Sequence, residues 1–315
     1  MKMISRPKIF IISFFSLLSS AMPQDKFVEK SGQPVLVLIK DNFINAKFSP
    51  DGNFIAITNQ NYKDIYLYDI KNDDIKLLTE GFATGFGMSW AKNGKWILSK
   101  LAKFENKRRY NSIIAYNIFN SDKIVFIENE TYLPGIPVWG ADDGFIYMNG
   151  GDQLKLISSK DQSDERNISG FVVYAAGNSI IQHNLENGNK KILFKGEGYI
   201  LNLRQSPDGK KVVYEIAGGD LWVLDIETFE KTKLGIGHEP SWNPNSDKIA
   251  YMVTEDNGHV IISSEIFVIN ADGTGKINLT QTSDQLEMRP DWHPDGKWII
   301  YDLDGFGPIT MQKIE

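Results

Sequence analysis

Six segments of the chain share one pattern of apolar and polar positions. In each, a polar turn rich in Pro, Asp, Asn and Gly is followed at once by an apolar, largely β-branched run. The residues that precede the turns are Phe48, Trp90, Trp139, Gln205, Trp242 and Trp292. The apolar runs are 54–57, 96–98, 145–147, 212–214, 249–251 and 298–301. A strand–turn–strand unit that recurs in this way is the signature of a repeat fold.

A second recurring unit follows the first. It consists of an alternating strand, a polar turn and a short closing strand, as in 64–70 with 75–79 and in 220–225 with 231–234. Each repeat therefore contains four antiparallel strands, and repeats of this kind arranged radially form a β-propeller. No long stretch of helical periodicity occurs after residue 22, so we predict an all-β protein.

The spacing of the turns predicts the number of blades. Gly144 and Gly209 mark successive turns 65 residues apart, which is too long for one blade of about 40–45 residues. This interval contains two copies of the second unit, at 152–169 and 178–194, so we infer a shrunken blade with 171–174 as its inner hairpin. We predict seven four-stranded blades, one of them degenerate. The alternative is six blades, with 145–195 forming one irregular blade.

Two strands at the ends of the repeat region have no blade of their own. Residues 308–312 form a third strand without a fourth, and residues 34–39 form a strand near the start of the chain. We expect these two strands to pair, because this pairing closes the ring and removes exposed sheet edges.

The first residues have the composition of a secretory signal peptide. Basic residues (Lys2, Arg6 and Lys8) precede the apolar run 9–18, and small residues end at Ala21. We expect a signal peptide over 1–21, a short linker over 22–33 and a single propeller domain over 34–315. The alternative is an uncleaved N-terminal anchor, although the run is too short to span a bilayer core of about 30 Å.

Composition narrows the functional classes. The chain has no Cys, which excludes disulfides, a thiol nucleophile and a lipoprotein signal, and favours a periplasmic or secreted bacterial protein. The net charge is −6, and without residues 1–21 it becomes −9, with 31 basic and 40 acidic residues. A negative protein repels phosphate backbones, so we do not expect a nucleic-acid partner. We interpret the one basic cluster, from Lys100 to Arg109, as a solvated loop between two strands.

Two stretches of the chain resemble a known repeat. Residues 289–301 and 265–280 are similar to the WD40-like (PD40) repeat of bacterial TolB-type propellers, and degenerate copies cover about residues 34–315. The resemblance implies a β-propeller. The N-terminal α/β domain of TolB is not expected here, because only a short segment separates Ala21 from the first propeller strand. We also find no Gly-x-Ser-x-Gly elbow of a prolyl-oligopeptidase-like hydrolase.

Candidate chemistry lies where the chain enters two innermost strands. His238 and Glu239 precede Trp242, and Glu287 and Arg289 precede Trp292. In a propeller these positions surround one mouth of the central channel. His238 could serve as a base or metal ligand, Glu239 and Glu287 as acids or ligands, and Arg289 as a clamp for a carboxylate. The alternative is that these residues only solvate a wet channel, since no metal-type spacing is present.

We predict a monomeric, non-enzymatic module of the cell envelope that binds a protein or glycan partner. We assign no catalytic residue, metal or cofactor, and expect no transmembrane span. The alternative is a metal-assisted sugar-acid lyase, because some propellers with this repeat resemble oligogalacturonate lyase. His238 would then be the base or a ligand, Glu239 and Glu287 would complete the metal shell, and Arg289 would hold the uronate carboxylate.

Overall fold

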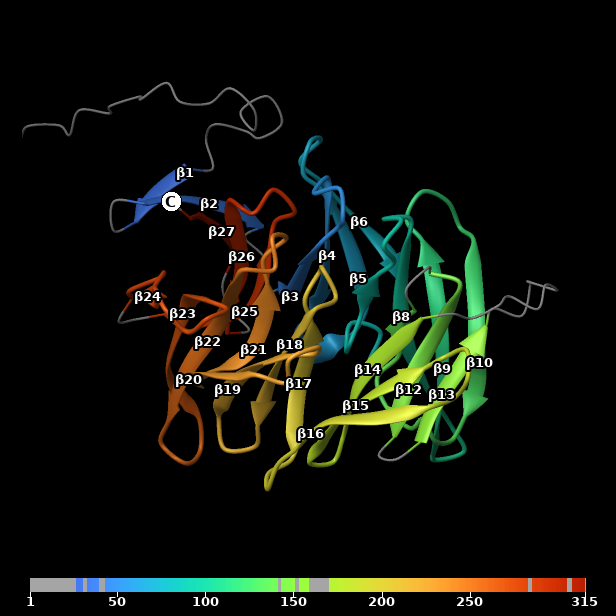
Figure 1. Cartoon of the computed structure of the whole chain (residues 1–315). Helices are drawn as coiled ribbons and strands as arrows, with labels where there is room; N and C mark the ends of the chain where they lie inside the picture. The colour runs from blue at the N-terminus through green and yellow to red at the C-terminus, as the bar shows by residue number, and fades with distance from the viewer. Residues whose placement is uncertain are drawn as a thin grey trace, which may run out of the picture.

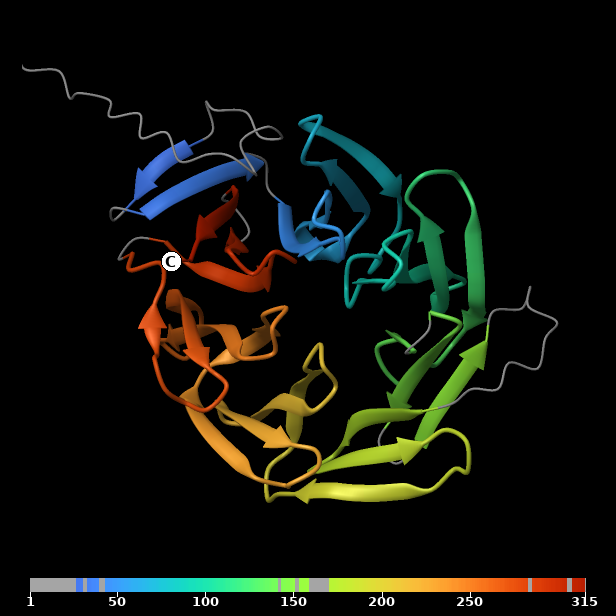
Figure 2. The same cartoon turned by 45° about the horizontal axis from the view of Figure 1, so that its top comes forward.

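The strands (Figure 1) form seven antiparallel sheets arranged around a central axis, as Figure 2 shows. The computed structural model describes residues 27–30, 33–39, 43–140, 143–150, 153–158, 170–282, 285–304 and 308–314. Within these residues no helix is both long and apolar enough to cross a membrane. The predicted all-β propeller is confirmed, and it has seven blades. The expected signal peptide, residues 1–21, lies outside the described residues.

Four blades contain four strands each, paired in chain order from the innermost strand outward. Blade 1 consists of β3 (Phe43–Phe48), β4 (Phe54–Asn59), β5 (Ile65–Asp69) and β6 (Asp74–Thr79), with the 3-10 turn η2 (Gln60–Tyr62) after β4. Blade 2 consists of β7 (Ser89–Trp90), β8 (Trp96–Glu105), β9 (Arg108–Asn117) and β10 (Lys123–Glu130). Blade 5 consists of β17 (Ile200–Gln205), β18 (Lys211–Ile216), β19 (Asp220–Asp225) and β20 (Lys231–Ile236). Blade 6 consists of β21 (His238–Trp242), β22 (Lys248–Asp256), β23 (Ile261–Asn270) and β24 (Ile277–Asn278).

Two blades have three strands each among the described residues. Blade 3 consists of β11 (Val138–Trp139), β12 (Phe145–Gly150) and β13 (Gln153–Ser158), and blade 4 of β14 (Phe171–Ala176), β15 (Ser179–Asn184) and β16 (Lys190–Lys195). The strand predicted at 166–169 lies outside the described residues.

The shrunken blade inferred from the sequence is blade 4. Leu185 N donates to Gly170 O at 2.9 Å, just as Ile70 N donates to Asn53 O at 3.1 Å in blade 1. This bond joins the end of a third strand to the start of a second strand, so β14 takes the second position. Among the described residues, blade 4 therefore has no innermost strand.

The seventh blade closes the ring with both ends of the chain. Its sheet runs β1 (Phe27–Lys30), β2 (Gln33–Ile39), β27 (Ile309–Lys313), β26 (Trp298–Leu303) and β25 (Glu287–Trp292). β2 is antiparallel to β27, with Val37 opposite Thr310. In Figure 2 the blue N-terminal strands lie beside the red C-terminal strands. The predicted closure by residues 34–39 is confirmed.

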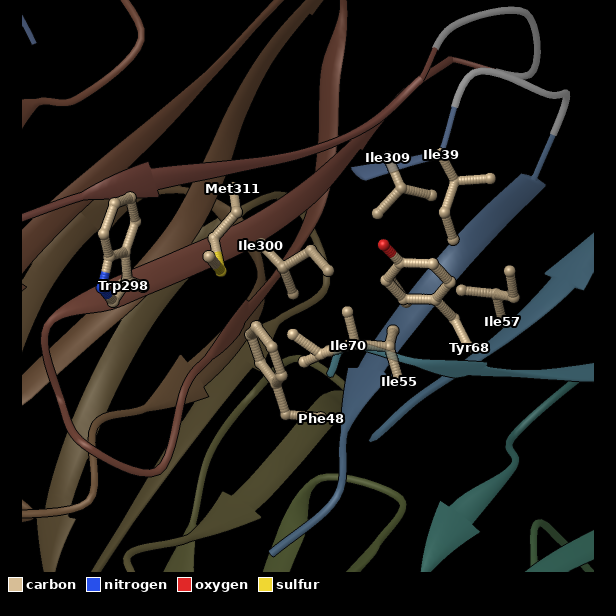
Figure 3. Packing of buried hydrophobic residues seen from close by; sticks show 11 residues of the cluster. Ile39, Phe48, Ile55, Ile57, Tyr68, Ile70, Trp298, Ile300, Ile309 and Met311 are labelled. Carbon is tan, nitrogen blue, oxygen red and sulfur yellow. The ribbon is translucent and has the colours of Figure 1, made fainter. Parts of the chain in front are cut away.

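The core lies between neighbouring blades. At the junction of blades 7 and 1, Trp298, Ile300 and Met311 from one sheet belong to the same buried cluster as Phe48 and Ile55 from the other (Figure 3). Each of these side chains is at most 6% exposed. Burial of such side chains contributes about 1.5–3 kcal/mol each, so the apolar run after each turn holds adjacent blades together.

Tryptophans at the turns also join the blades by hydrogen bonds. The indole Nε1 of Trp292 donates to Ser241 O at 3.0 Å, in the preceding blade. The equivalent bonds of the other three tryptophans at this repeat position are Trp90 to Lys47 O, Trp139 to Ser89 O and Trp242 to Arg204 O. These four tryptophans therefore pack between blades.

The basic cluster from Lys100 to Arg109 is not a loop, so that prediction was wrong. Residues Trp96–Glu105 and Arg108–Asn117 form the long strands β8 and β9, which pair without interruption from Trp96 to Glu105. Only Asn106 and Lys107 turn the chain, both with positive φ (48° and 64°), as a two-residue hairpin turn with left-handed residues requires. Lys103, Arg108 and Arg109 occupy exposed positions of these strands, and Lys100 is half-buried in β8. In the sequence, such exposed charged positions look the same as those of a loop.

Candidate functional site

The innermost strands carry a β-bulge at the same repeat position in four blades. Pairing shifts occur after Ile44 in β3, Leu201 in β17, His238 in β21 and Met288 in β25. The next residue of each strand has positive φ, between 47° and 56°; these residues are Asn45, Asn202, Glu239 and Arg289. Bulges redirect side chains and are common beside functional sites. Two of the predicted site residues therefore occupy one structural position in neighbouring blades.

Arg289 is engaged by a buried carboxylate. Its Nε donates to Asp302 Oδ2 at 2.9 Å and its Nη2 to Asp302 Oδ1, and Asp302 is fully buried in β26. Asp302 Oδ2 also accepts from Asn45 N of blade 1 at 2.9 Å. Burial alone would lower the pKa of Arg289, but the hydrogen bond and charge of Asp302 outweigh it and raise that pKa. This ion pair therefore connects blade 7 to blade 1.

His238 is engaged in the same way by Glu215 of β18. Its Nδ1 lies 2.8 Å from Glu215 Oε1, and Glu215 Oε2 accepts from Asn202 Nδ2 at 2.9 Å. The Glu215 side chain is only 6% exposed, whereas that of His238 is 29% exposed. The hydrogen bond to Glu215 raises the pKa of His238 against the effect of burial, and the charges of Glu215 and Glu239 add to the rise.

The two carboxylates are equivalent by repeat. Glu215 and Asp302 each follow a buried Tyr in the second strand of their blades (Tyr214 and Tyr301). Each binds the bulge residue of its own blade and one group of the next blade. We call Glu215 and Asp302 the blade-bridging carboxylates. The sequence analysis identified neither residue. Both directly follow a Tyr in the apolar run after a turn, and this shared pair of Tyr and acidic residue could have revealed them.

Glu287 is not exposed at a mouth of the central channel, where we expected it. It is fully buried in β25, and its Oε1 accepts from Thr282 Oγ1 at 2.7 Å. Its main-chain oxygen accepts from Ser264 Oγ of blade 6 at 2.5 Å. The structure thus brings His238 and Glu239 together and places Arg289 with Asp302. Glu287 lies apart between blades 6 and 7, so the four predicted residues do not form one site.

The donor set does not fit a resident metal ion. Within the described part of the chain, no group of three or more His, Asp and Glu side chains could hold one. His238 meets one carboxylate, and that carboxylate also binds an amide. Catalytic metal sites usually have three protein ligands and an open position. The arrangement of His238, Glu215 and Asn202 is that of a hydrogen-bonded bridge between blades.

His293 also has a local structural partner. Its Nδ1 lies 2.8 Å from Asp295 Oδ1 within the turn, and its ring packs edge-on against Phe48 of blade 1. A Cβ atom on Gly52, the turn residue with φ +72°, would lie 2.6 Å from the imidazole Nε2. His293 is therefore a turn side chain that is bonded locally.

Comparison with known proteins agrees with the propeller. No protein-family model matches the chain. A tricorn protease homolog of Saccharolobus solfataricus is 25% identical over 262 residues, which cover 80% of this chain and 21% of that protein. This chain therefore spans about a fifth of that curated relative's length.

Two solved structures are similar over most of their length. The putative TolB from Agrobacterium tumefaciens superimposes with a TM-score of 0.52 at 14% identity, covering 87% of this chain and 91% of that one. An oligogalacturonate lyase in complex with manganese gives a TM-score of 0.52 at 13% identity, covering 92% and 96%. The expected TolB-like propeller is confirmed at the level of the fold.

Proposed function

We propose that this chain is a non-enzymatic binding module exported to the bacterial cell envelope, where it holds a macromolecular partner on one propeller face. The observation that carries the proposal is the state of two of the predicted site residues. Arg289, the group best suited to clamp a carboxylate, is already bound by Asp302, and Nδ1 of His238 is bound by Glu215. Their role is to hold neighbouring blades in register.

A rigid ring of this kind is a suitable scaffold for a binding protein. Asn45 N donates to Asp302, and His238 is hydrogen-bonded to Glu215, so both contacts join neighbouring blades at an innermost strand; apolar clusters join the blades as well. A rigid scaffold lets the loops between strands present side chains in fixed positions, which is where binding residues of such folds are usually found. The site on the loops, and not the fold, then defines the partner.

Capture in the envelope tests this proposal. The mature chain is crosslinked in envelope fractions of the source bacterium and purified, with an unrelated periplasmic protein of similar charge as the control. We expect one or a few proteins or glycans to be enriched over the control. Mass spectrometry of the exported chain is expected to show Met22 as the first residue. No enrichment over the control would count against the binding role.

One observation favours a second candidate, the sugar-acid lyase. The pairing of His238 Nδ1 with a buried carboxylate is the arrangement that orients a general base. Such a base would remove the proton beside a uronate carboxylate, and the glycosidic oxygen would then leave to form an unsaturated sugar. Arg289 is less suited to hold the substrate, because it is already bound by Asp302. This rival predicts a uronate-dependent rise in ultraviolet absorbance that disappears in His238→Ala.

A further inference from the structure

Exposed aromatic rings gather on blades 1 and 2 and on the connection between them. Phe82, Phe86 and Phe104 are 58%, 44% and 62% exposed. Phe82 and Phe86 lie on the connection from β6 to β7, and Phe104 lies on β8. The rings of Phe82 and Phe104 meet edge-on at 6.1 Å, and Phe86 meets Tyr62 at 5.4 Å. Contiguous apolar groups on a surface are typical of interaction sites.

The connection that carries Phe82 and Phe86 is held by hydrogen bonds of its backbone on both sides. Ala102 N of blade 2 donates to Phe82 O at 2.9 Å, and Gly85 N donates to Tyr62 O of blade 1 at 3.0 Å. Asn45 Nδ2, beside Asp302, donates to Gly85 O at 3.1 Å. The connection is therefore tied to the bridge between blades 7 and 1, and the rings remain exposed although they are apolar.

The backbone beneath the rings is strained. Tyr62 and Ala83 have φ values of 54° and 63°. Left-handed backbone of this kind costs about 1–3 kcal/mol per residue and gathers at binding and switch regions. The fold thus maintains a costly local conformation at the place where it exposes three phenylalanines.

Cations surround the rings. Lys63 Nζ lies 5.6 Å from the centre of the Phe82 ring. Arg109 is directly opposite Phe104 in the β8–β9 ladder, and Lys100 is on the same face of β8 as Phe104. None of the ion pairs within the described residues includes Lys63, Lys100 or Arg109. Burial and the nearby Arg109 charge lower the pKa of Lys100, as expected for cations held together without a counter-charge.

The acidic residues nearby do not neutralise these cations. Asp64 is buried and accepts from Gly81 N at 2.7 Å. Glu105 is opposite Arg108, on the other face of the β8–β9 hairpin. Arg109 Nε donates to Asn111 Oδ1 at 3.0 Å, and among the described residues none of the three cations has an ion-pair partner, in a chain whose net charge is −6. We define the aromatic–basic surface as Lys63, Phe82, Phe86, Lys100, Phe104 and Arg109.

We infer that the aromatic–basic surface binds an acidic peptide segment of a partner protein. The carboxylates of the segment pair with Lys63, Lys100 and Arg109, and its apolar side chains cover the phenylalanine rings. A peptide suits the surface better than an anionic glycan, because one segment of a peptide can combine carboxylates with fully apolar side chains that cover the exposed phenyl rings. The inference rests on the proposed function and adds the location of the partner site and the chemistry that it recognises.

The test uses the full mature chain and a random-sequence peptide library displayed on phage. We expect enrichment of peptides that combine Asp or Glu with Leu, Ile or Phe. The most enriched peptide is then synthesised with a fluorescent label, and its dissociation constant is measured by anisotropy at low and high salt. Affinity is expected to fall as salt rises, because the carboxylate–cation pairs are exposed.

Three variants locate the binding. Phe82→Ser/Phe104→Ser and Lys63→Glu/Arg109→Glu are expected to weaken binding by about tenfold or more, as removal of central contact residues does. The charge-reversed variant is also expected to select basic peptides from the library. The matched control is Val260→Ser/Ile262→Ser, because these side chains are 60% and 56% exposed in the β22–β23 hairpin of blade 6. The control is expected to bind like the unmodified chain.

Several outcomes would overturn the inference: no enriched peptide, an enriched motif without acidic residues, equal affinity in all variants, or competition by polygalacturonate with no peptide binding. Envelope crosslinking separates this failure from that of the proposed function. A partner captured equally by the chain and by Phe82→Ser/Phe104→Ser would refute the surface but leave the binding module standing. If crosslinking captures no partner at all, the proposed function itself is refuted.

Discussion

Glu215 and Asp302 illustrate how single buried residues organise this propeller. Each lies in the second strand of its blade, accepts from the bulge residue of that blade and reaches a group of the next blade. A buried carboxylate that lacks some of its hydrogen-bond partners would destabilise the fold, because the desolvation penalty of its charge exceeds the energy of a single contact. Both residues therefore depend on complete bonding across the junction.

Asp302→Asn is expected to destabilise the fold strongly. The substitution preserves shape but leaves the largely buried Arg289 guanidinium without its counter-charge, a change that typically costs about 3–5 kcal/mol. Urea unfolding followed by tryptophan fluorescence gives the free energy of unfolding. The control is Asp220→Asn, which breaks the exposed pair with Lys233 (2.9 Å) and is expected to cost at most about 1 kcal/mol. Equal losses in the two variants would contradict the role given to Asp302.

Glu215→Gln is expected to lower the pKa of His238. In the folded protein the hydrogen bond to Glu215 raises that pKa above its ordinary value of 6.5. The raised pKa of His238 adds to the free energy of unfolding. This contribution is fully present at pH values below the ordinary pKa of His and is lost as the pH rises through the higher pKa of His238 in the folded protein. NMR titration of the imidazole measures the change, with the three other histidines as internal controls. An unchanged His238 titration in the variant would refute the bridge.

At the scale of elements, the turn tryptophans show what a sequence can predict. Their positions at one place in the repeat were sufficient to predict packing between blades, because a shared position implies a shared environment. Their indole hydrogen bonds to the preceding blade could not be predicted, since they depend on the distance between blades. The β8–β9 hairpin was missed for a related reason, because its charged residues resemble those of a loop.

The candidate site was predicted only in part. The sequence correctly placed Glu239 and Arg289 at matching positions, because both precede a turn tryptophan by three residues. The sequence did not predict the β-bulges that redirect these two residues. It also did not predict that carboxylates of the second strands would bind Arg289 and His238. Such contacts join residues of different strands and different blades, and no local pattern specifies them.

Trp242→Phe is expected to cost about 1–3 kcal/mol in unfolding free energy. The substitution removes the indole donor to Arg204 O (3.0 Å) and part of the buried Trp242 ring, and the lost hydrogen bond and packing together have a cost of this size. Trp298→Phe is the matched control, because the buried Trp298 Nε1 has no hydrogen-bond partner among the described residues. Denaturant unfolding of both variants makes the comparison. A larger loss for Trp298→Phe would contradict the importance of the hydrogen bond.

At the scale of the whole molecule, both ends of the chain meet in one sheet. β2 pairs with β27, so the ring is closed by strands from opposite ends of the sequence. Hydrophobic residues of blades 7 and 1 bury one another across this closure, as Figure 3 shows. The last blade to close thus connects the N-terminal segment to the rest of the ring.

A disulfide across the closure is expected to form in Val37→Cys/Thr310→Cys. These residues are directly opposite one another, and the natural chain has no Cys that could compete. Oxidation is expected to raise the free energy of unfolding by about 2–4 kcal/mol. Val35→Cys/Thr310→Cys is two positions out of register, which at about 3.3 Å per residue exceeds disulfide reach. Efficient crosslinking of this second pair would contradict the observed register.

The most direct test of the central claim, that this propeller binds and does not catalyse, is an absorbance measurement. The purified mature chain, at high concentration, is incubated with several uronate oligosaccharides, with and without Mn²⁺, beside His238→Ala. We predict no rise in ultraviolet absorbance for either protein, because Arg289 is already bound by Asp302 and, within the described residues, no group of three His, Asp and Glu side chains could hold a metal ion beside His238. A uronate-dependent rise that His238→Ala abolishes would contradict the account and establish the lyase.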